Sequence, residues 1–401
     1  MMNPKDSRRL IEVLRSGVPS RQASAYFTNA RVKLRHEIEH TLDQMCENGQ
    51  SSCKIITGKY GEGKTHLLNT VFNMASERNM VVSMIPLSKE IPFNKLDEIY
   101  ASIMRNTYLP DRAQPGFMHE LHSQFKNSEF VSRLVMFTST ELERNRLMYL
   151  VKTYASAKNE DDIYRIQADF QGAFLLQSEV KKLYKGVYKE TARFNEPWKK
   201  TEHIMDYFYF MSYVFECLGY HGWVILFDEA ELTGRLGIKS RMKAYGNMDQ
   251  FVDPSSRFRS VYTMMAFTSS YTEDVIEKKH DYEYLDVNEP ANKANIKHVL
   301  DQIIAAPQLA ELTRSEIKDI LLNIIDLHKA AYNWDPGIAS DEVICTALNA
   351  GYLLRTKIRT AIELLDQLYQ YGEAGSITIG DMMSGSYEEI PSLDELNEEE
   401  I

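Results

Sequence analysis

The sequence contains 401 residues with a net charge of −11, and 44% of its residues are hydrophobic. This composition is ordinary for a globular protein and excludes collagen-like and low-complexity chains, and the longest apolar runs are far too short to cross a bilayer. The four cysteines lie far apart without a CxxC pair and the N-terminus is polar, so we expect a cytoplasmic protein with no disulfide framework, zinc knuckle or membrane partner.

Charge is distributed unevenly along the chain. Between residues 381 and 401 there are eight acidic residues and no Lys or Arg, so the remainder carries a net charge of only about −3. Basic residues gather in two stretches, 5–35 and 235–259. Such clusters could form a local cationic face for nucleic acid, although charge runs are more often solvated surface.

Hydrophobic spacing predicts the first elements of the chain. Apolar residues at helical spacing predict helices over residues 5–16 and 28–49. A β-rich run at 54–57 leads into a glycine loop, which is followed by an amphipathic helix at 66–77 and a strand at 80–87. Strand, loop, helix and strand in this order form a βαβ unit, so a parallel sheet is expected.

The middle of the chain, from about residue 94 to 219, has an almost wholly helical pattern, and we expect one long helix over 130–154. A continuous apolar run at 223–227 is typical of a strand buried in a parallel sheet. Further strands are predicted at 261–267 and 282–287.

Beyond Pro290 only helical patterns remain. Thr313 and Glu316 have the spacing of a capping box at the start of one helix. Ser340 is expected to cap a second helix, and the last amphipathic helix covers residues 353–371.

These elements divide the chain into four parts. N-terminal helices over residues 1–50 are expected to pack on an α/β domain at 51–289, which carries a helical insertion at about 94–219. A C-terminal helical domain follows at 290–372. Residues 373–401 are acidic and lack periodicity, so we expect a mostly disordered tail.

The glycine loop at residues 58–65 fits the pattern GxxxxGK[ST] in full. Its glycines let the backbone fold tightly around phosphate oxygens, and the helix that follows adds its positive N-terminal end. Lys64 is expected to reach the β- and γ-phosphates of ATP, and the Thr65 hydroxyl to ligate Mg²⁺. A chance glycine turn is disfavoured by the flanking strand and helix. The residues predicted to contact the nucleotide are Gly58, Tyr60, Gly61, Glu62, Gly63, Lys64, Thr65 and His66.

An acidic pair follows the apolar strand at 223–227. Asp228 is expected to hold Mg²⁺ directly or through water, as a Walker-B aspartate. Glu229 is then placed to orient or deprotonate the water that attacks the γ-phosphate, with Lys64 as its catalytic partner. The pair could instead cap a helix N-terminus, or the site could bind ATP without appreciable hydrolysis.

Several further polar positions could contribute to the site. Ser269 closes the fourth strand, where it could sense the γ-phosphate or simply cap the next helix. Arg355 and Arg359 open the last helix and could either meet ATP or form a solvated face. Arg257 and Arg259 are candidates for an arginine finger supplied to a neighbouring molecule. His66, beside the loop, is expected to pack rather than to act chemically.

With these motifs in place, the chain resembles the ATP-binding proteins of the BREX phage-defence systems, the BrxD-like P-loop family. The likeness runs from about residue 7 to 110 and, more loosely, from 220 to 370. It is carried by RRLIEVLRSGV at residues 8–18, GKYGEGKTHLL at 58–68, VVSMIPLS at 81–88 and ILFDEAE at 225–231.

The resemblance implies an α/β P-loop NTPase of the AAA+-like kind, with a parallel sheet, a large helical insertion and a C-terminal helical domain. It also implies an ATPase that acts as a motor or switch in antiviral defence. The implied partners are a helicase-type protein from the same operon, DNA, and further copies of the chain on ATP binding. Residues 29–33 depart from the Gly-Arg-Glu pattern of AAA+ relatives, so adenine contacts are not carried over.

A second function is consistent with the same motifs. The chain could be a nucleotide-dependent signalling or scaffold protein that binds ATP, changes shape and engages only proteins. The acidic tail and the long helical insertion suit this alternative.

Overall fold

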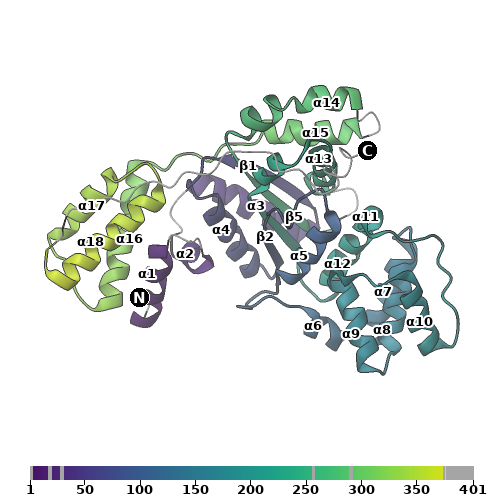
Figure 1. The fold of residues 1–401 in the computed structure, drawn as a ribbon. Coiled ribbons are helices and arrows are strands. Elements are labelled where there is room, and N and C mark those ends of the chain that lie inside the picture. The colour runs from purple at the N-terminus through teal and green to yellow at the C-terminus, as the bar shows by residue number, and fades with distance from the viewer. Residues whose placement is uncertain are drawn as a thin grey trace.

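The computed structural model describes residues 3–16, 20–27, 31–254, 258–288, 292–373 and 375. A five-stranded sheet with the order β1-β5-β4-β2-β3 lies at the centre of the molecule (Figure 1). The strands β1, β5, β4 and β2 are parallel, whereas β3 runs antiparallel to β2. Their bounds are β1 Ser52–Gly58, β2 Val81–Pro86, β3 Thr107–Tyr108, β4 Trp223–Asp228 and β5 Val261–Thr268.

Four of the predicted strands are confirmed, and the two central ones are the most apolar. Every residue of β4 and β5 is buried, as expected for strands covered on both faces. Side chains alternate between the two faces, so that Ile225 and Phe227 belong to one hydrophobic cluster while Val224 and Leu226 belong to another.

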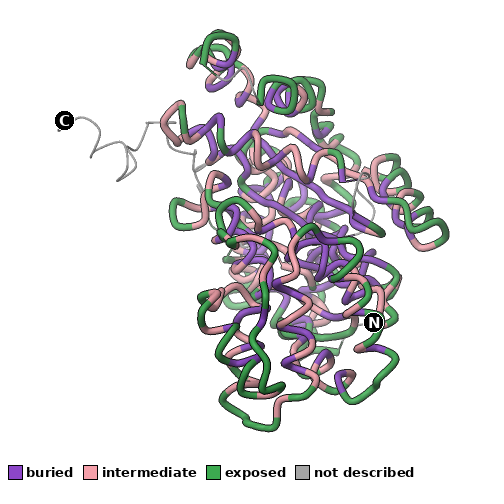
Figure 2. Tube along the Cα trace, turned by 90° about the vertical axis from the view of Figure 1, so that its right-hand side faces the viewer, coloured by how far each residue is buried: buried purple, intermediate pink, exposed green. Residues whose placement is uncertain are grey.

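Helices cover both faces of the sheet, and burial is concentrated in the strands and the helix surfaces that meet them (Figure 2). One face packs against helices on both sides of the glycine loop, α3 Val32–Asn48 and α4 Lys64–Glu77. The other face packs against α5 Leu96–Arg105, α12 Met205–Cys217 and α13 Ile238–Val252.

The strand predicted at 282–287 is wrong, because this segment forms the helix α14 Asp281–Asn288. It packs beside α15 Lys293–Ile304, with Leu285 in the core. The outer edge of β1 is instead paired by residues 307–309: Thr57 N donates to Pro307 O at 3.1 Å, and Leu309 N donates to Thr57 O at 2.7 Å. The chain therefore leaves the sheet beside the glycine loop.

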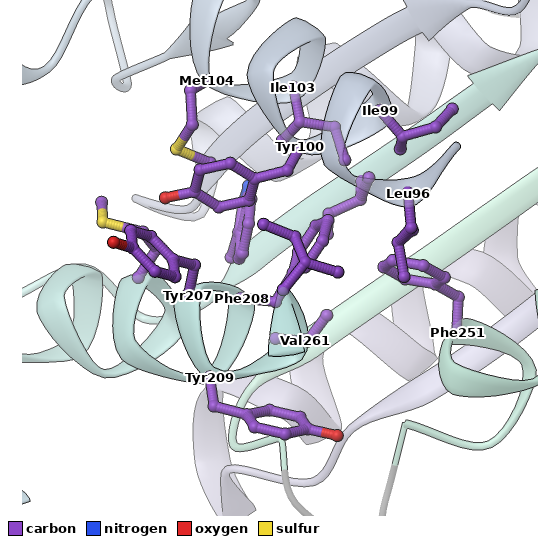
Figure 3. Close-up of a cluster of buried hydrophobic side chains, with 14 of the residues drawn as sticks. Leu96, Ile99, Tyr100, Ile103, Met104, Tyr207, Phe208, Tyr209, Phe251 and Val261 are labelled. Carbon is purple, nitrogen blue, oxygen red and sulfur yellow. The ribbon is translucent and has the colours of Figure 1, made fainter. Parts of the chain in front are cut away.

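The helical middle of the chain is built onto the same core as the sheet. Tyr100 on α5 packs against Tyr207 and Phe208 on α12, with ring centroids 5.6 and 5.0 Å apart (Figure 3). The single helix predicted at 130–154 is wrong, because the structure has two helices separated by a turn. The helices of this region are α6 Met118–Gln124, α7 Ser128–Thr140, α8 Arg146–Ser156, α9 Glu160–Ala168, α10 Gln177–Tyr188 and α11 Lys200–His203.

The break between α7 and α8 has a physical cause. Arg146, the first residue of α8, is buried and donates from Nη2 to Asp169 Oδ2 at 2.6 Å and from Nε to Tyr207 Oη at 2.9 Å. These contacts hold the start of α8 in place, because a buried charge without a partner is costly.

The N-terminal helices and the C-terminal helices share one hydrophobic cluster. The C-terminal helices are α16 Arg314–Tyr332, α17 Ala339–Asn349 and α18 Leu354–Tyr371. The predicted capping box begins α16: Thr313 Oγ1 accepts from Glu316 N at 3.2 Å. Ser340 lies inside α17 rather than capping it. The N-terminal helices are α1 Pro4–Ser16 and α2 Arg21–Tyr26.

Leu10 and Ile11 of α1 are fully buried against the C-terminal helices. In addition, Arg15 pairs with Asp366 on α18 at 2.7 Å. Of the segment predicted to pack on the α/β domain, α3 does so, whereas α1 lies beside α16 and α18 (Figure 1).

In the part of the chain that the structure describes, no helix is both long and apolar enough to cross a membrane. The tail predicted from residue 373 lies outside the described residues, apart from residues 373 and 375.

Candidate functional site

The glycine loop connects the end of β1 to the start of α4 in a tight curve. Gly61 and Gly63 have φ angles of 78° and 90°, a left-handed conformation that glycine adopts without steric cost. A Cβ atom on Gly61 would lie 3.0 Å from Cδ2 of Leu353, at the start of α18. Glu62 Oε2 accepts a hydrogen bond from Lys59 N at 2.7 Å, and this bond closes the turn.

Lys64, the first residue of α4, is only 8% exposed. Its ammonium donates to Gly58 O at 3.0 Å and to Lys59 O at 3.5 Å. Its ion-pair partner is Glu231, whose Oε1 lies 3.8 Å from Nζ. Such partners are expected, because a buried ammonium group is unstable without them.

Thr65 and Asp228 come together although 163 positions separate them in sequence: Thr65 Oγ1 donates to Asp228 Oδ2 at 2.6 Å. The sheet order explains this contact. Parallel strands end at the same edge, and only β5 separates the strand before the loop from the strand that ends at Asp228. Asp228 Oδ1 also accepts from Glu229 N at 3.0 Å, so the carboxylate is held by its own turn.

The donor set at this point fits Mg²⁺. A threonine hydroxyl and an aspartate carboxylate are oxygen ligands, which this ion prefers, and Mg²⁺ is commonly held by few protein ligands together with phosphate oxygens. Asp228 is 5% exposed, and both side chains line one cavity. Thr65 and Asp228 are therefore the residues that could hold the ion.

Two more carboxylates follow Asp228 on the same turn. Glu229 has a φ of 57°, a conformation that is uncommon outside glycine, and it lines the cavity from an exposed position. Desolvation and the neighbouring Asp228 charge raise the pKa of Glu229. Glu231 is buried more deeply, and burial raises its pKa to about 7 although Lys64 acts in the opposite direction.

The cavity has a volume of about 320 Å³, within the range of small-molecule sites. One end is polar and contains the loop, Asp228 and Glu229. The other end is apolar and lies between the N-terminal and C-terminal helices. Its apolar lining residues are Leu14, Ala23, Phe27, Leu312, Ile320, Leu354 and Ile358.

Arg31 also lines the cavity and connects its walls. Its guanidinium donates from Nη2 to Glu62 O at 2.6 Å and from Nε to Ala310 O at 3.2 Å. Its backbone N donates to Glu316 Oε1 at 3.3 Å. Burial lowers the pKa of Arg31, while the charges of Glu62 and Glu316 act in the opposite direction. This residue therefore joins the loop to the start of α16.

The predicted nucleotide contacts fall into two groups. Tyr60, Gly61, Gly63, Lys64, Thr65 and His66 all line the cavity. Gly58 and Glu62 are not lining residues but shape the loop through the hydrogen bonds described above. His66 Nδ1 lies 3.2 Å from Ser24 Oγ, and burial lowers the pKa of His66, consistent with packing.

The weaker candidates are spread more widely. Arg355 lines the cavity from α18, whereas Arg359, one turn later, does not. Ser269 N donates to Gly58 O at 3.2 Å, so Ser269 lies beside the loop without lining the cavity. Arg259 is exposed before the start of β5, at the opposite edge of the sheet from the loop. Arg257 lies outside the described residues.

Sequence reasoning missed three parts of this site: Arg31, Glu231 and the apolar end. Arg31 belongs to a basic stretch, and residues 29–33 around it depart from the motif of relatives, so no pattern distinguished it. Glu231 follows the acidic pair closely in sequence, but its approach to Lys64 depends on η2, the short helix Ala230–Arg235. The apolar end combines helices from both ends of the chain, and periodicity alone does not identify their partners.

The sheet and the loop together define the class of protein. A mostly parallel sheet ends in a GxxxxGK[ST] loop at β1 and in an acidic pair at β4, and β5 lies between these strands. This arrangement is the P-loop NTPase fold, here with a helical insertion and C-terminal helices.

Comparison with known families identifies the particular group. The family model described as BREX system ATP-binding protein BrxC/D matches residues 2–127 and 188–376. The chain therefore belongs to this family of phage-defence ATP-binding proteins, as the sequence motifs predict. The segment between the matched ranges contains α7, α8, α9 and most of α10.

Among solved structures, a Walker-type ATPase of Pyrococcus abyssi is similar to 84% of this chain and 68% of that chain, with 11% identity and a TM-score of 0.36. Because this likeness is loose, the fold assignment rests on the strand order and the family match. Comparison with curated proteins gave no match.

Proposed function

We propose that the chain binds Mg-ATP in the cavity beside the glycine loop and hydrolyses it. The observation that carries this proposal is the 2.6 Å contact between Thr65 Oγ1 and Asp228 Oδ2. The contact supports the proposal because a hydroxyl and a carboxylate are ligands that suit Mg²⁺, and because Lys64 and Glu229 line the same cavity.

Each residue has a task that follows from its position. The loop N–H groups and Lys64 bind the β- and γ-phosphates, and Thr65 and Asp228 hold the ion. When bound, Mg²⁺ neutralises charge that develops on the phosphate oxygens. Glu229, at the exposed edge of the cavity, orients the attacking water and accepts its proton, and its raised pKa suits that task.

The remaining lining residues fit the rest of the nucleotide. The apolar end of the cavity offers the adenine a dry surface formed by residues such as Phe27, Ile320 and Ile358. Arg355 adds a positive charge from α18. ATP would thus contact the sheet domain and the C-terminal helices together, which is the requirement for a motor or switch that changes shape with the nucleotide.

The hydrolytic role is tested by Glu229→Gln. We expect the variant to bind Mg-ATP as the wild type does but to turn it over about 10²- to 10⁴-fold more slowly, because a positioned base contributes about that factor. Calorimetric binding and phosphate release measure the two properties separately. Lys64→Ala serves as the reference for lost binding. Wild-type turnover in Glu229→Gln would remove Glu229 from this role.

We propose that ATP turnover drives a motor or switch in BREX defence that acts with DNA and a helicase-type partner. Family membership supports the defence context, and cationic contacts to DNA phosphates would make the interaction salt-sensitive. The ATPase rate should therefore rise with DNA at low salt. An ATPase rate that is unchanged by single- or double-stranded DNA would contradict the proposal that the protein acts with DNA.

The alternative is a signalling or scaffold protein that engages only proteins. It is favoured by the helical segment between residues 127 and 188, which the family model does not match and which could carry a contact specific to this chain. Mass measurement with and without ATP, alone and with neighbouring gene products, distinguishes a protein-only assembly from self-association.

A further inference from the structure

Glu231 is a buried acid that the proposed hydrolysis does not use. It lies on η2, directly after the strand that carries Asp228, and is only 9% exposed. Its Oε1 is the ion-pair partner of Lys64 Nζ at 3.8 Å. Its Oε2 is buried without a hydrogen-bond partner among the described residues, a situation that native proteins rarely tolerate without a reason.

The position of Lys64 supplies that reason. In this arrangement the ammonium is directed toward Gly58 O and Glu231, whereas a phosphate-binding loop requires it at the β- and γ-phosphates. An ammonium group has only three donors, so contacts to phosphate oxygens compete with the contacts seen here. Both anions attract the same cation, and they also repel each other.

We propose that Glu231 competes with the β- and γ-phosphates of ATP for the Lys64 ammonium. The phosphates must displace Glu231 from Lys64, so Glu231 sets the affinity for ATP. This inference rests on the proposed ATP site. Glu231 is a positioning residue, because its carboxylate holds the Lys64 ammonium at 3.8 Å when no nucleotide is bound. It also lowers the affinity for ATP, because Glu231 adds a third carboxylate to Asp228 and Glu229 in a cavity that receives the negatively charged triphosphate.

The packing of η2 explains why Glu231 cannot simply move away. A Cβ atom on Gly234, in the same short helix, would lie 2.6 Å from Cγ2 of Val275. In addition, Lys279 Nζ donates to Gly234 O at 3.1 Å. The backbone that carries Glu231 is therefore fixed against the segment after β5, and Lys64 is the member of the pair with the freedom to change partners.

The test is Glu231→Gln, which keeps the shape of the side chain and removes its charge. We expect Mg-ATP to bind about 5- to 100-fold more tightly than to the wild type, the usual range for energetic coupling between two interactions. The affinity for ADP should increase as well. The affinity for AMP should not increase, because AMP lacks the phosphates that Lys64 is proposed to reach.

The control is Glu311→Gln, which removes a negative charge from an exposed residue that pairs with Lys59 of the same loop. This variant should bind ATP as the wild type does. Glu231→Asp keeps the charge, so its affinity for ATP should stay close to that of the wild type. It provides a second comparison if the glutamine variant folds poorly.

Unchanged ATP affinity in a folded Glu231→Gln protein would overturn the inference, as would an equal gain for AMP or in Glu311→Gln. These outcomes are separable from failure of the proposed function. If the wild type and Lys64→Ala both fail to bind Mg-ATP, the site assignment fails first. If the wild type binds and Lys64→Ala does not, but Glu231→Gln binds ATP no more tightly than the wild type, the competition alone is refuted.

Discussion

At the scale of single residues, burial changes the pKa values of charged side chains in the site. Glu231 is the clearest case, because burial raises its pKa from 4.5 to about 7. The folded protein therefore holds this proton more tightly than the unfolded chain does between these two pH values. The free energy of unfolding contributed by this group is then largest below pH 4.5 and declines as the pH rises to about 7.

This linkage predicts the behaviour of Glu231→Gln in stability measurements without nucleotide. The variant should unfold like the wild type near pH 4.5 and be more stable at pH 8, by up to about 3 kcal/mol, because one pKa unit corresponds to about 1.4 kcal/mol. Denaturant unfolding at several pH values measures the difference. Parallel stability profiles for the two proteins would show that Glu231 titrates normally.

At the scale of elements, Arg31 connects three parts of the chain at one point. It precedes α3, its guanidinium bonds to the glycine loop and to Ala310, and its backbone bonds to Glu316 on α16. The ion pair between Lys59 and Glu311 is a second contact between the loop and the segment that leads into the C-terminal helices. Arg31 is therefore one of the residues that hold this segment against the loop.

We predict that Arg31→Ala lowers the free energy of unfolding by about 1.5–3 kcal/mol, the usual contribution of hydrogen bonds made by a charged group. It should also weaken ATP binding about tenfold or more, because the two walls of the cavity lose their link. Thermal unfolding and calorimetry measure both effects. Arg314→Ala, at an exposed position on α16, is the matched control, and an identical result for the two variants would contradict the prediction.

At the scale of the whole molecule, the N-terminal helices α1 and α2 and the C-terminal helices α16 to α18 build one helical unit that lines the apolar end of the cavity. The α1 residues Leu10 and Ile11 are fully buried among residues of the C-terminal helices. The sheet, by contrast, has separate clusters on its two faces. Any motion of the C-terminal helices relative to the sheet must therefore carry α1 with it.

We predict that Ile11→Ala destabilises this unit by about 2–5 kcal/mol, the usual cost of removing a buried branched side chain. ATP affinity should fall as well, although Ile11 is not a lining residue of the cavity, because the walls formed by α1 and α18 lose their packing. Ile338→Ala, at a residue that is 94% exposed, is the control. Wild-type stability in Ile11→Ala would contradict the packing described here.

The sequence by itself determined the parts of this protein that local patterns encode. The GxxxxGK[ST] loop, the apolar run ending in Asp228 and Glu229, and the capping box at Thr313 each depend on residues a few positions apart. Four of the five predicted strands are confirmed, and the clearest of them, β4, is a continuous apolar run of the kind that buried parallel strands have. The P-loop fold and the family therefore follow from the sequence.

Tertiary structure alone decided the partners of these elements. The segment at 282–287 is a helix, and the outer edge of β1 is paired by residues 307–309. Arg31 meets Ala310 and α1 meets α16 across roughly 280 to 320 positions of sequence. Periodicity identifies which face of an element is apolar but not which distant face covers it, and it is the free energy of burial that selects that partner.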